Sequence, residues 1–158
     1  MNPPGKPKTV TPALTASDLV MPVLGGGRVL VVESGEDAAA VLTALLRLNG
    51  FDARTARTGA AALAAAAATR PAVVVTDLDL PDADACGVIR RLRALPRPPA
   101  VVVLTAYTDL GHRRAAAAAG AAEYVLKPSE PTDLVAIVQR LCSHRAAEFG
   151  ADDARPAE

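Results

Sequence analysis

The sequence has 158 residues, a length typical of one domain. Seventeen basic and seventeen acidic side chains give a formal charge of zero, and no long run of one sign is present, which disfavours binding of nucleic acid through charge. Only two cysteines, Cys86 and Cys142, are present, which excludes a disulfide framework and a sulfur-ligated metal cluster. No apolar run approaches the roughly 18 residues that a membrane span needs, so we expect no membrane segment and a cytoplasmic protein.

The two ends of the chain differ in composition from its middle. Residues 1–27 are rich in proline, threonine and glycine and lack the apolar run of an export signal, which predicts a flexible arm. Residues 28–142 carry the aliphatic runs and predict one folded domain. Residues 143–158 predict a disordered tail that is too short and too polar for an effector domain. We therefore expect a single domain that acts by binding other proteins.

Short aliphatic runs alternate along the chain with segments of helical character. Strands are predicted at residues 29–32, 51–56, 73–75, 101–104 and 123–127. Helices are predicted at residues 37–48, 60–68, 84–95, 109–119 and 132–142, and two of them end at Gly50 and Gly120. This alternation predicts an α/β fold, with five parallel strands in one doubly wound sheet and five helices.

Polar residues that directly follow the predicted strands are the candidates for function, because doubly wound sheets bind ligands beyond the carboxyl ends of their strands. These residues are Glu33 and Ser34, Asp77, Thr105 and Lys127. A cluster of carboxylates is costly unless a cation neutralises it, and Mg²⁺ prefers hard oxygen ligands of this kind. Carboxylates, a hydroxyl and a lysine around one metal ion indicate a site that handles a phosphoryl group.

Several of these pieces have the order and spacing of one family. They are Val-Val-Glu-Ser at residues 31–34, Val-Thr-Asp-Leu-Asp-Leu-Pro at 75–81, Val-Leu-Thr-Ala at 103–106, Ala-Gly-Ala at 119–121 and Tyr-Val-Leu-Lys-Pro at 124–128. Together they make residues 28–142 resemble a response-regulator receiver domain of two-component signalling. The resemblance implies a CheY-like, flavodoxin-like fold.

The resemblance also implies a role for each residue that matches a motif. Asp77 would accept a phosphoryl group from a sensor histidine kinase or a phosphotransfer protein in an Mg²⁺-dependent phosphorelay. Thr105 and Lys127 would contact the phosphoryl oxygens, and the peptide bond from Lys127 to Pro128 is expected to be cis. The chain would then be a phospho-accepting signalling domain and not an enzyme.

The metal and the switch are implied in the same way. Glu33, Asp77 and the backbone carbonyl of Asp79 would bind Mg²⁺. Tyr124 would be the aromatic residue that moves after phosphorylation. The face around Tyr124 would bind a downstream protein or a second copy of the chain, with no role for nucleic acid or a membrane.

The sequence departs from the family at one important position. Ser34 stands where receiver domains usually carry the second acid of the metal pocket, and a hydroxyl is a poorer ligand than a carboxylate. This leaves lower metal affinity, use of the Asp79 side chain, or a pseudo-receiver that binds partners without phosphorylation as alternatives. A less favoured resemblance, carried by Asp77 and Asp79 after a buried strand, is to haloacid-dehalogenase-like phosphatases, which need a longer chain after this motif and a cap domain.

Overall fold

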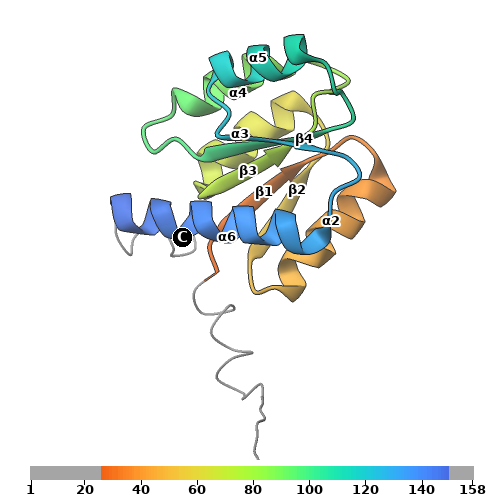
Figure 1. Cartoon of the computed structure of the whole chain (residues 1–158). Helices are drawn as coiled ribbons and strands as arrows, with labels where there is room; N and C mark the ends of the chain where they lie inside the picture. Colours follow the sequence, from red (N-terminus) through yellow and green to blue (C-terminus); the bar gives the residue numbers. More distant parts are fainter. Residues whose placement is uncertain (1–25, 150–158) are drawn as a thin grey trace, which may run out of the picture.

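A five-stranded parallel sheet forms the centre of the computed structural model, which describes residues 26–149 (Figure 1). The strands are β1 (Arg28–Val32), β2 (Asp52–Ala56), β3 (Val73–Thr76), β4 (Ala100–Thr105) and β5 (Glu123–Leu126). Their order across the sheet is β2-β1-β3-β4-β5, and all four pairings are parallel. The predicted α/β fold with one doubly wound sheet is confirmed.

Five helices cover the two faces of the sheet. They are α2 (Glu36–Leu48), α3 (Gly59–Thr69), α4 (Ala85–Arg93), α5 (Leu110–Ala119) and α6 (Pro131–Phe149). Helices α2 and α6 pack on one face, and α3, α4 and α5 pack on the other (Figure 1). Within residues 26–149, no helix is both long and apolar enough to cross a membrane.

Alternate side chains of the central strands supply two separate cores. Val29 and Val31 of β1 pack with α2 and α6, whereas Leu30 and Val32 pack with the three helices on the opposite face. Strands β3 and β4 divide their valines in the same way. A strand that is covered on both faces needs apolar residues at every position, which is why these strands appear in the sequence as unbroken aliphatic runs.

The alanine-rich helices contribute small side chains to the core. Ala62 and Ala66 of α3 and Ala116 of α5 are at most 1% exposed. Alanine also has the highest helix propensity, so these segments form helices while packing close to the sheet. Helix α5 ends at Gly120, whose φ of 115° lies in the left-handed region that favours glycine, as the sequence predicts.

Helix α6 differs from its predicted bounds of 132–142 at both ends. It begins at Pro131, which is favoured at the first position of a helix because that position needs no backbone N–H donor. It continues to Phe149, so residues 143–149 of the predicted tail are helical. The buried Arg145 donates a hydrogen bond to the Arg97 carbonyl and anchors this extension to the segment before β4. The remainder of the predicted arm and tail, 1–25 and 150–158, lies outside the described residues.

The burial of α2 predicts a contrast between two of its leucines. Leu46 is 0% exposed and Leu48 is 85% exposed. Leu46→Ala should lower the free energy of unfolding by about 2–5 kcal/mol, because it removes buried methyl groups and leaves a cavity. Leu48→Ala, the matched control on the same helix, should change it by no more than about 0.5 kcal/mol. Urea unfolding followed by circular dichroism measures both, and similar losses in the two variants would contradict this placement.

Candidate functional site

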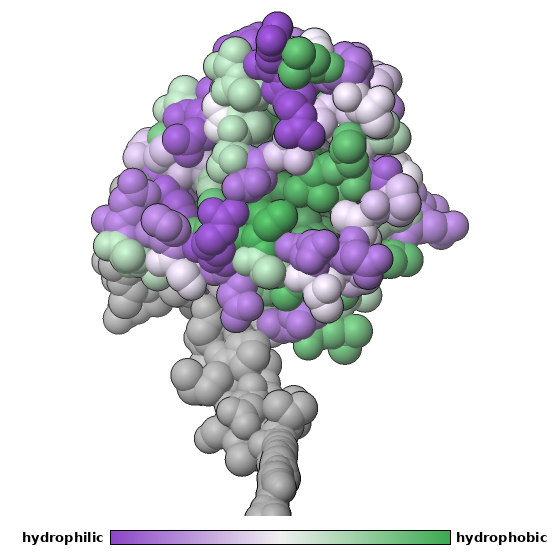
Figure 2. Space-filling view, viewed as in Figure 1, coloured by the Kyte–Doolittle hydropathy of each residue, from purple (hydrophilic) through white to green (hydrophobic). Residues whose placement is uncertain are grey.

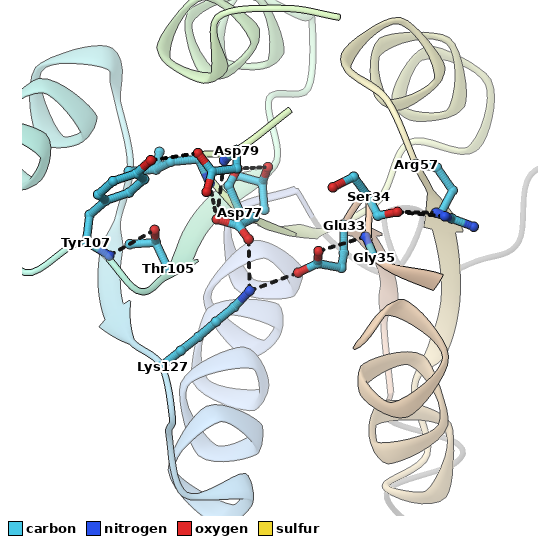
Figure 3. A network of polar contacts seen from close by, with 11 residues as sticks. Glu33, Ser34, Gly35, Arg57, Asp77, Asp79, Thr105, Tyr107 and Lys127 are labelled. Carbon is cyan, nitrogen blue, oxygen red and sulfur yellow. Dashed lines mark hydrogen bonds and ion pairs between the residues drawn. The ribbon is translucent and has the colours of Figure 1, made fainter. Parts of the chain in front are cut away.

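The predicted site residues meet at the carboxyl edge of the sheet (Figure 3). Glu33 follows β1, Asp77 follows β3, Thr105 ends β4 and Lys127 follows β5. Backbone hydrogen bonds continue the strand pairing into this edge, since the Asp77 N–H donates to the Val32 carbonyl at 3.1 Å and the Lys127 N–H donates to the Thr105 carbonyl at 2.8 Å. These residues are therefore positioned by the hydrogen-bonded backbone of the sheet.

Lys127 is the cation between the two acids. Its Nζ donates to Glu33 Oε1 at 2.9 Å and to Asp77 Oδ2 at 2.8 Å. The carboxylate side chains are only 10% and 11% exposed, so their mutual repulsion would be poorly screened without this charge. Burial lowers the pKa of Lys127, but its bonds to Asp77 and Glu33 outweigh burial and raise the pKa above its ordinary value of 10.5. The ammonium is therefore charged at neutral pH.

Backbone N–H groups orient the same two carboxylates. Glu33 Oε2 accepts a hydrogen bond from the Gly35 N–H at 3.0 Å. Asp77 Oδ1 accepts hydrogen bonds from the N–H groups of Leu78 and Asp79, at 2.6 and 3.3 Å. A carboxylate has about four acceptor positions, so both retain capacity for a further ligand. Mg²⁺ binds proteins through one or two carboxylates and keeps several waters, so this donor set fits it.

The Asp79 carboxylate points toward Tyr107 and is not part of the ion-paired group around Lys127 (Figure 3). Its Oδ1 accepts a hydrogen bond of 2.9 Å from the Tyr107 hydroxyl, and this bond is the main cause that raises the pKa of Tyr107 (Figure 3). Among the residues that the structure describes, no group of three or more His, Cys, Asp or Glu side chains is arranged to bind a metal ion. The bond to Tyr107 occupies one Asp79 oxygen, and the backbone carbonyl of Asp79 stays the predicted third ligand.

Tyr107 connects the pocket to the predicted switch residue. Its N–H donates to Thr105 Oγ1 at 3.3 Å, and its carbonyl accepts a 2.8 Å hydrogen bond from the Tyr124 hydroxyl. Its ring stacks on His112, with centroids 4.1 Å apart. The Arg113 guanidinium lies 4.8 Å from the centroid of the Tyr124 ring, a cation–π contact. The sequence pattern predicts roles for Thr105 and Tyr124, but it does not indicate that Tyr107 joins them.

Ser34 lies beside Arg57, for which the sequence motifs predict no role. The Arg57 guanidinium donates two hydrogen bonds to the Ser34 carbonyl, at 2.9 and 2.6 Å (Figure 3). Arg57 directly follows β2, which pairs with β1, so the rule that selects residues at carboxyl strand ends could have found it. A guanidinium therefore adjoins the position where receiver domains usually carry an acid.

An apolar hollow adjoins the pocket on the face formed by α2 and α6 (Figure 2). Its volume is about 390 Å³, and Glu33 and Lys127 are among its lining residues. Val41 of α2 contributes to this lining although its side chain is 70% exposed. The polar pocket thus opens beside an apolar surface.

Comparison with known proteins identifies the family. The model of the response regulator receiver domain matches residues 29–139. The chain belongs to the response regulator receiver family. The receiver is similar to the transcriptional regulatory protein PrrA of Mycobacterium leprae, with 42% identity over 76% of this chain and 52% of the relative. It is also similar to the DNA-binding response regulator MtrA of Mycolicibacterium paratuberculosis, with 38% identity over 83% of this chain and 55% of the relative.

Solved structures agree with this assignment. The CheY-like receiver domain protein of Methanospirillum hungatei has a TM-score of 0.73 and 22% identity, over 78% of this receiver and 98% of that chain. The BeF3-activated DrrB receiver domain has a TM-score of 0.68 and 28% identity, over 75% of this receiver and 98% of that chain. The predicted fold family is confirmed, and the cis bond between Lys127 and Pro128 is present as expected. The receiver spans about half the length of the curated relatives it matches.

The double ion pair predicts a stability change with a defined pH dependence. Lys127→Met keeps an unbranched side chain but leaves Glu33 and Asp77 without their cation, so the free energy of unfolding at neutral pH should fall by about 1–3 kcal/mol. Because the folded pKa of Lys127 is raised, its contribution is complete below pH 10.5 and is lost as the pH rises through the folded pKa. The methionine variant should lack this alkaline loss.

Urea unfolding between neutral pH and about pH 11 measures both effects. Lys127→Arg, which retains a cation, is the control and should recover part of the stability. A methionine variant as stable as the parent at neutral pH would show that the ion pairs contribute nothing.

Proposed function

We propose that this receiver accepts a phosphoryl group on Asp77 from a sensor histidine kinase or a phosphotransfer protein. The observation that supports this most directly is the arrangement around Asp77. Its carboxylate is oriented by two backbone N–H groups, lies 2.8 Å from the Lys127 ammonium and shares that ammonium with Glu33. A cytoplasmic location is part of this proposal, and the similarity to a transcriptional regulatory protein and a DNA-binding response regulator supports it.

Mg²⁺ would be held by the carboxylates of Glu33 and Asp77 and by the backbone carbonyl of Asp79. When bound, Mg²⁺ supplies positive charge that neutralises the phosphoryl oxygens during transfer. Ser34 offers only a hydroxyl where a second carboxylate beside Glu33 would strengthen binding. We therefore expect the affinity for Mg²⁺ to be lower than in a pocket that carries an acid in place of Ser34. The unused acceptor capacity of both carboxylates supports this assignment.

In the transfer step, a carboxylate oxygen of Asp77 forms a bond to phosphorus as the bond from phosphorus to the donor imidazole nitrogen breaks. The imidazole nitrogen keeps the electron pair and takes a proton from solvent. The hydrogen bond from Lys127 to Glu33 holds the ammonium next to Asp77, so the ammonium can bind a phosphoryl oxygen in the product. Thr105 ends the neighbouring strand and can donate its hydroxyl to another phosphoryl oxygen.

The signal would leave the pocket through Tyr107. When Thr105 turns to the phosphoryl group, it withdraws from the Tyr107 N–H, and the Tyr107 carbonyl binds the Tyr124 hydroxyl. A shift of Tyr124 also changes its contact with Arg113 on α5. We propose that the face around Tyr124 and Arg113 binds a downstream protein or a second copy of the chain.

Two other functions are less well supported. A pseudo-receiver that lacks phosphorylation would not need Asp77, Glu33 and Lys127 to remain together, and here these three side chains form one ion-paired group. A phosphatase of the haloacid-dehalogenase type is disfavoured by the match of residues 29–139 to the receiver family. The chain is therefore best described as a signalling domain.

The choice of phospho-acceptor is tested by Asp77→Asn. Incubation with acetyl phosphate and Mg²⁺ should add a phosphoryl group to the parent protein, and this product should be absent from the variant because an amide is not a nucleophile of this kind. Asp79→Asn is the control and should remain labelled, since its backbone carbonyl is kept and its amide oxygen can still accept the hydrogen bond from Tyr107. Intact-protein mass spectrometry measures both, and labelling of Asp77→Asn would show that a different carboxylate reacts.

The effect of Ser34 is tested by restoring the acid. Ser34→Asp adds a carboxylate beside Glu33 and should tighten Mg²⁺ binding about tenfold, or about 1.4 kcal/mol. Ser34→Asn, a neutral side chain of similar size, is the matched control and should leave the affinity near that of the parent. Calorimetric titration with Mg²⁺ measures both affinities, and equal affinities of Ser34→Asp and Ser34→Asn would contradict this role of Ser34.

A separate experiment tests the pseudo-receiver alternative. Beryllofluoride with Mg²⁺ should shift the NMR signals of Tyr124 in the parent protein. A parent protein that binds no beryllofluoride would favour the pseudo-receiver.

A further inference from the structure

The loop from β3 to α4 carries Asp79 and is held by few hydrogen bonds to the rest of the chain. In the described part of the protein, no backbone-to-backbone hydrogen bond involves residues 78–83. Leu78 and Leu80 pack against the core beneath α3, α4 and α5, and side-chain hydrogen bonds attach the loop to other segments. One connection is the bond from the Tyr107 hydroxyl to Asp79, and the other two are made by Asp82. The path of the loop therefore depends on a few side-chain contacts.

Asp82 attaches the loop to the beginning of α3. The Gly59 N–H donates to Asp82 Oδ1 at 2.7 Å, and the Ala60 N–H donates to Asp82 Oδ2 at 3.0 Å. These are the first two residues of α3, whose N–H groups have no partner within the helix. A carboxylate at this end also interacts favourably with the helix dipole, and the two backbone hydrogen bonds lower the pKa of Asp82.

Helix α3 also has a cap that is local to it, so capping of the helix and attachment of the loop can be tested separately. Thr58, the residue before α3, accepts a hydrogen bond from the Ala61 N–H at 3.0 Å. Thr58 is local to the helix, whereas Asp82 is more than twenty residues away in sequence. Loss of either side chain should weaken the same helix end, but only Asp82 also connects the loop to it.

Packing at Gly59 gives independent evidence that the loop lies directly against α3. A methyl group on Gly59 would lie 2.8 Å from the Ala83 Cβ and 3.0 Å from the Val88 Cγ2. Both distances are shorter than ordinary carbon contacts, so only a glycine allows this approach. Loop and helix are therefore in van der Waals contact as well as joined by two hydrogen bonds.

We infer that Asp82 is a positioning residue for the Asp77 pocket, because it holds the loop that carries Asp79 against α3. Asp79 lies between two attached points, Asp77 and Asp82, and its N–H helps to orient the Asp77 carboxylate. Release of Asp82 would let the Asp79 backbone move relative to Asp77. The consequence for Mg²⁺ rests on the proposed function, whereas the ordering of the loop does not.

The experiment compares Asp82→Ala with Thr58→Ala in the full chain. In the metal-free protein, ¹⁵N relaxation measures the order parameters of the Leu78 and Asp79 amides. Asp82→Ala should lower them from about 0.85 toward about 0.6, whereas Thr58→Ala should leave them unchanged. Mg²⁺ titration should then show affinity about tenfold weaker in Asp82→Ala alone, the low end of the loss expected when support around metal ligands is removed. Asp82→Asn, which can still accept a hydrogen bond, should fall between the parent and the alanine variant.

The outcomes separate this inference from the proposed function. Unchanged order parameters in Asp82→Ala, or an equal fall in Thr58→Ala, would overturn the positioning role. A looser loop with parental Mg²⁺ affinity would also overturn it, because the pocket would then not depend on the loop. If the parent protein binds no Mg²⁺, the proposed function fails, and the order parameters alone decide whether Asp82 holds the loop. Asp82→Asn supplies this measurement if the alanine variant does not fold.

Discussion

Two buried carboxylates that share one ammonium form the interaction on which the site depends. Glu33 and Asp77 follow neighbouring strands, because β1 and β3 pair at the centre of the sheet. Lys127 comes from β5, beyond β4, and its long side chain reaches both acids (Figure 3). Without that cation, the two carboxylates would repel each other in a place that water screens poorly. The strand order of the sheet therefore determines the charge balance of the pocket.

A second set of contacts links the pocket to the surface. Tyr107 binds Asp79 through its hydroxyl, Thr105 through its N–H and Tyr124 through its carbonyl. One residue after β4 thus joins a loop of the pocket, a residue assigned to phosphoryl binding and an aromatic side chain on β5. A change at any of these three contacts would pass through a single backbone segment, which would give the proposed phosphorylation a short route to the proposed interaction face.

The loop after β3 shows how such a pocket is supported from outside. Residues 78–83 of the described chain make no hydrogen bond between backbone groups, so side chains determine the path of the loop. Leu78 and Leu80 pack against the core, and hydrogen bonds add two further attachments. Asp82 attaches it to α3, and Tyr107 attaches it to the segment after β4. Helix α3, which supplies no residue to the pocket, therefore contributes to its geometry.

The sequence by itself determined the strand pattern and the four polar residues that meet at the sheet edge. Buried strands leave unbroken aliphatic runs, and parallel strands bring the residues that follow them to one edge, so Glu33 and Lys127 could be placed together although they are 94 residues apart. Only the tertiary structure decided the continuation of α6 to Phe149 and the direction of the Asp79 side chain. It also decided the contact of Asp82 with α3, because hydrophobic periodicity describes one element at a time. Such contacts depend on how two elements approach each other and on the rotamers that their packing allows.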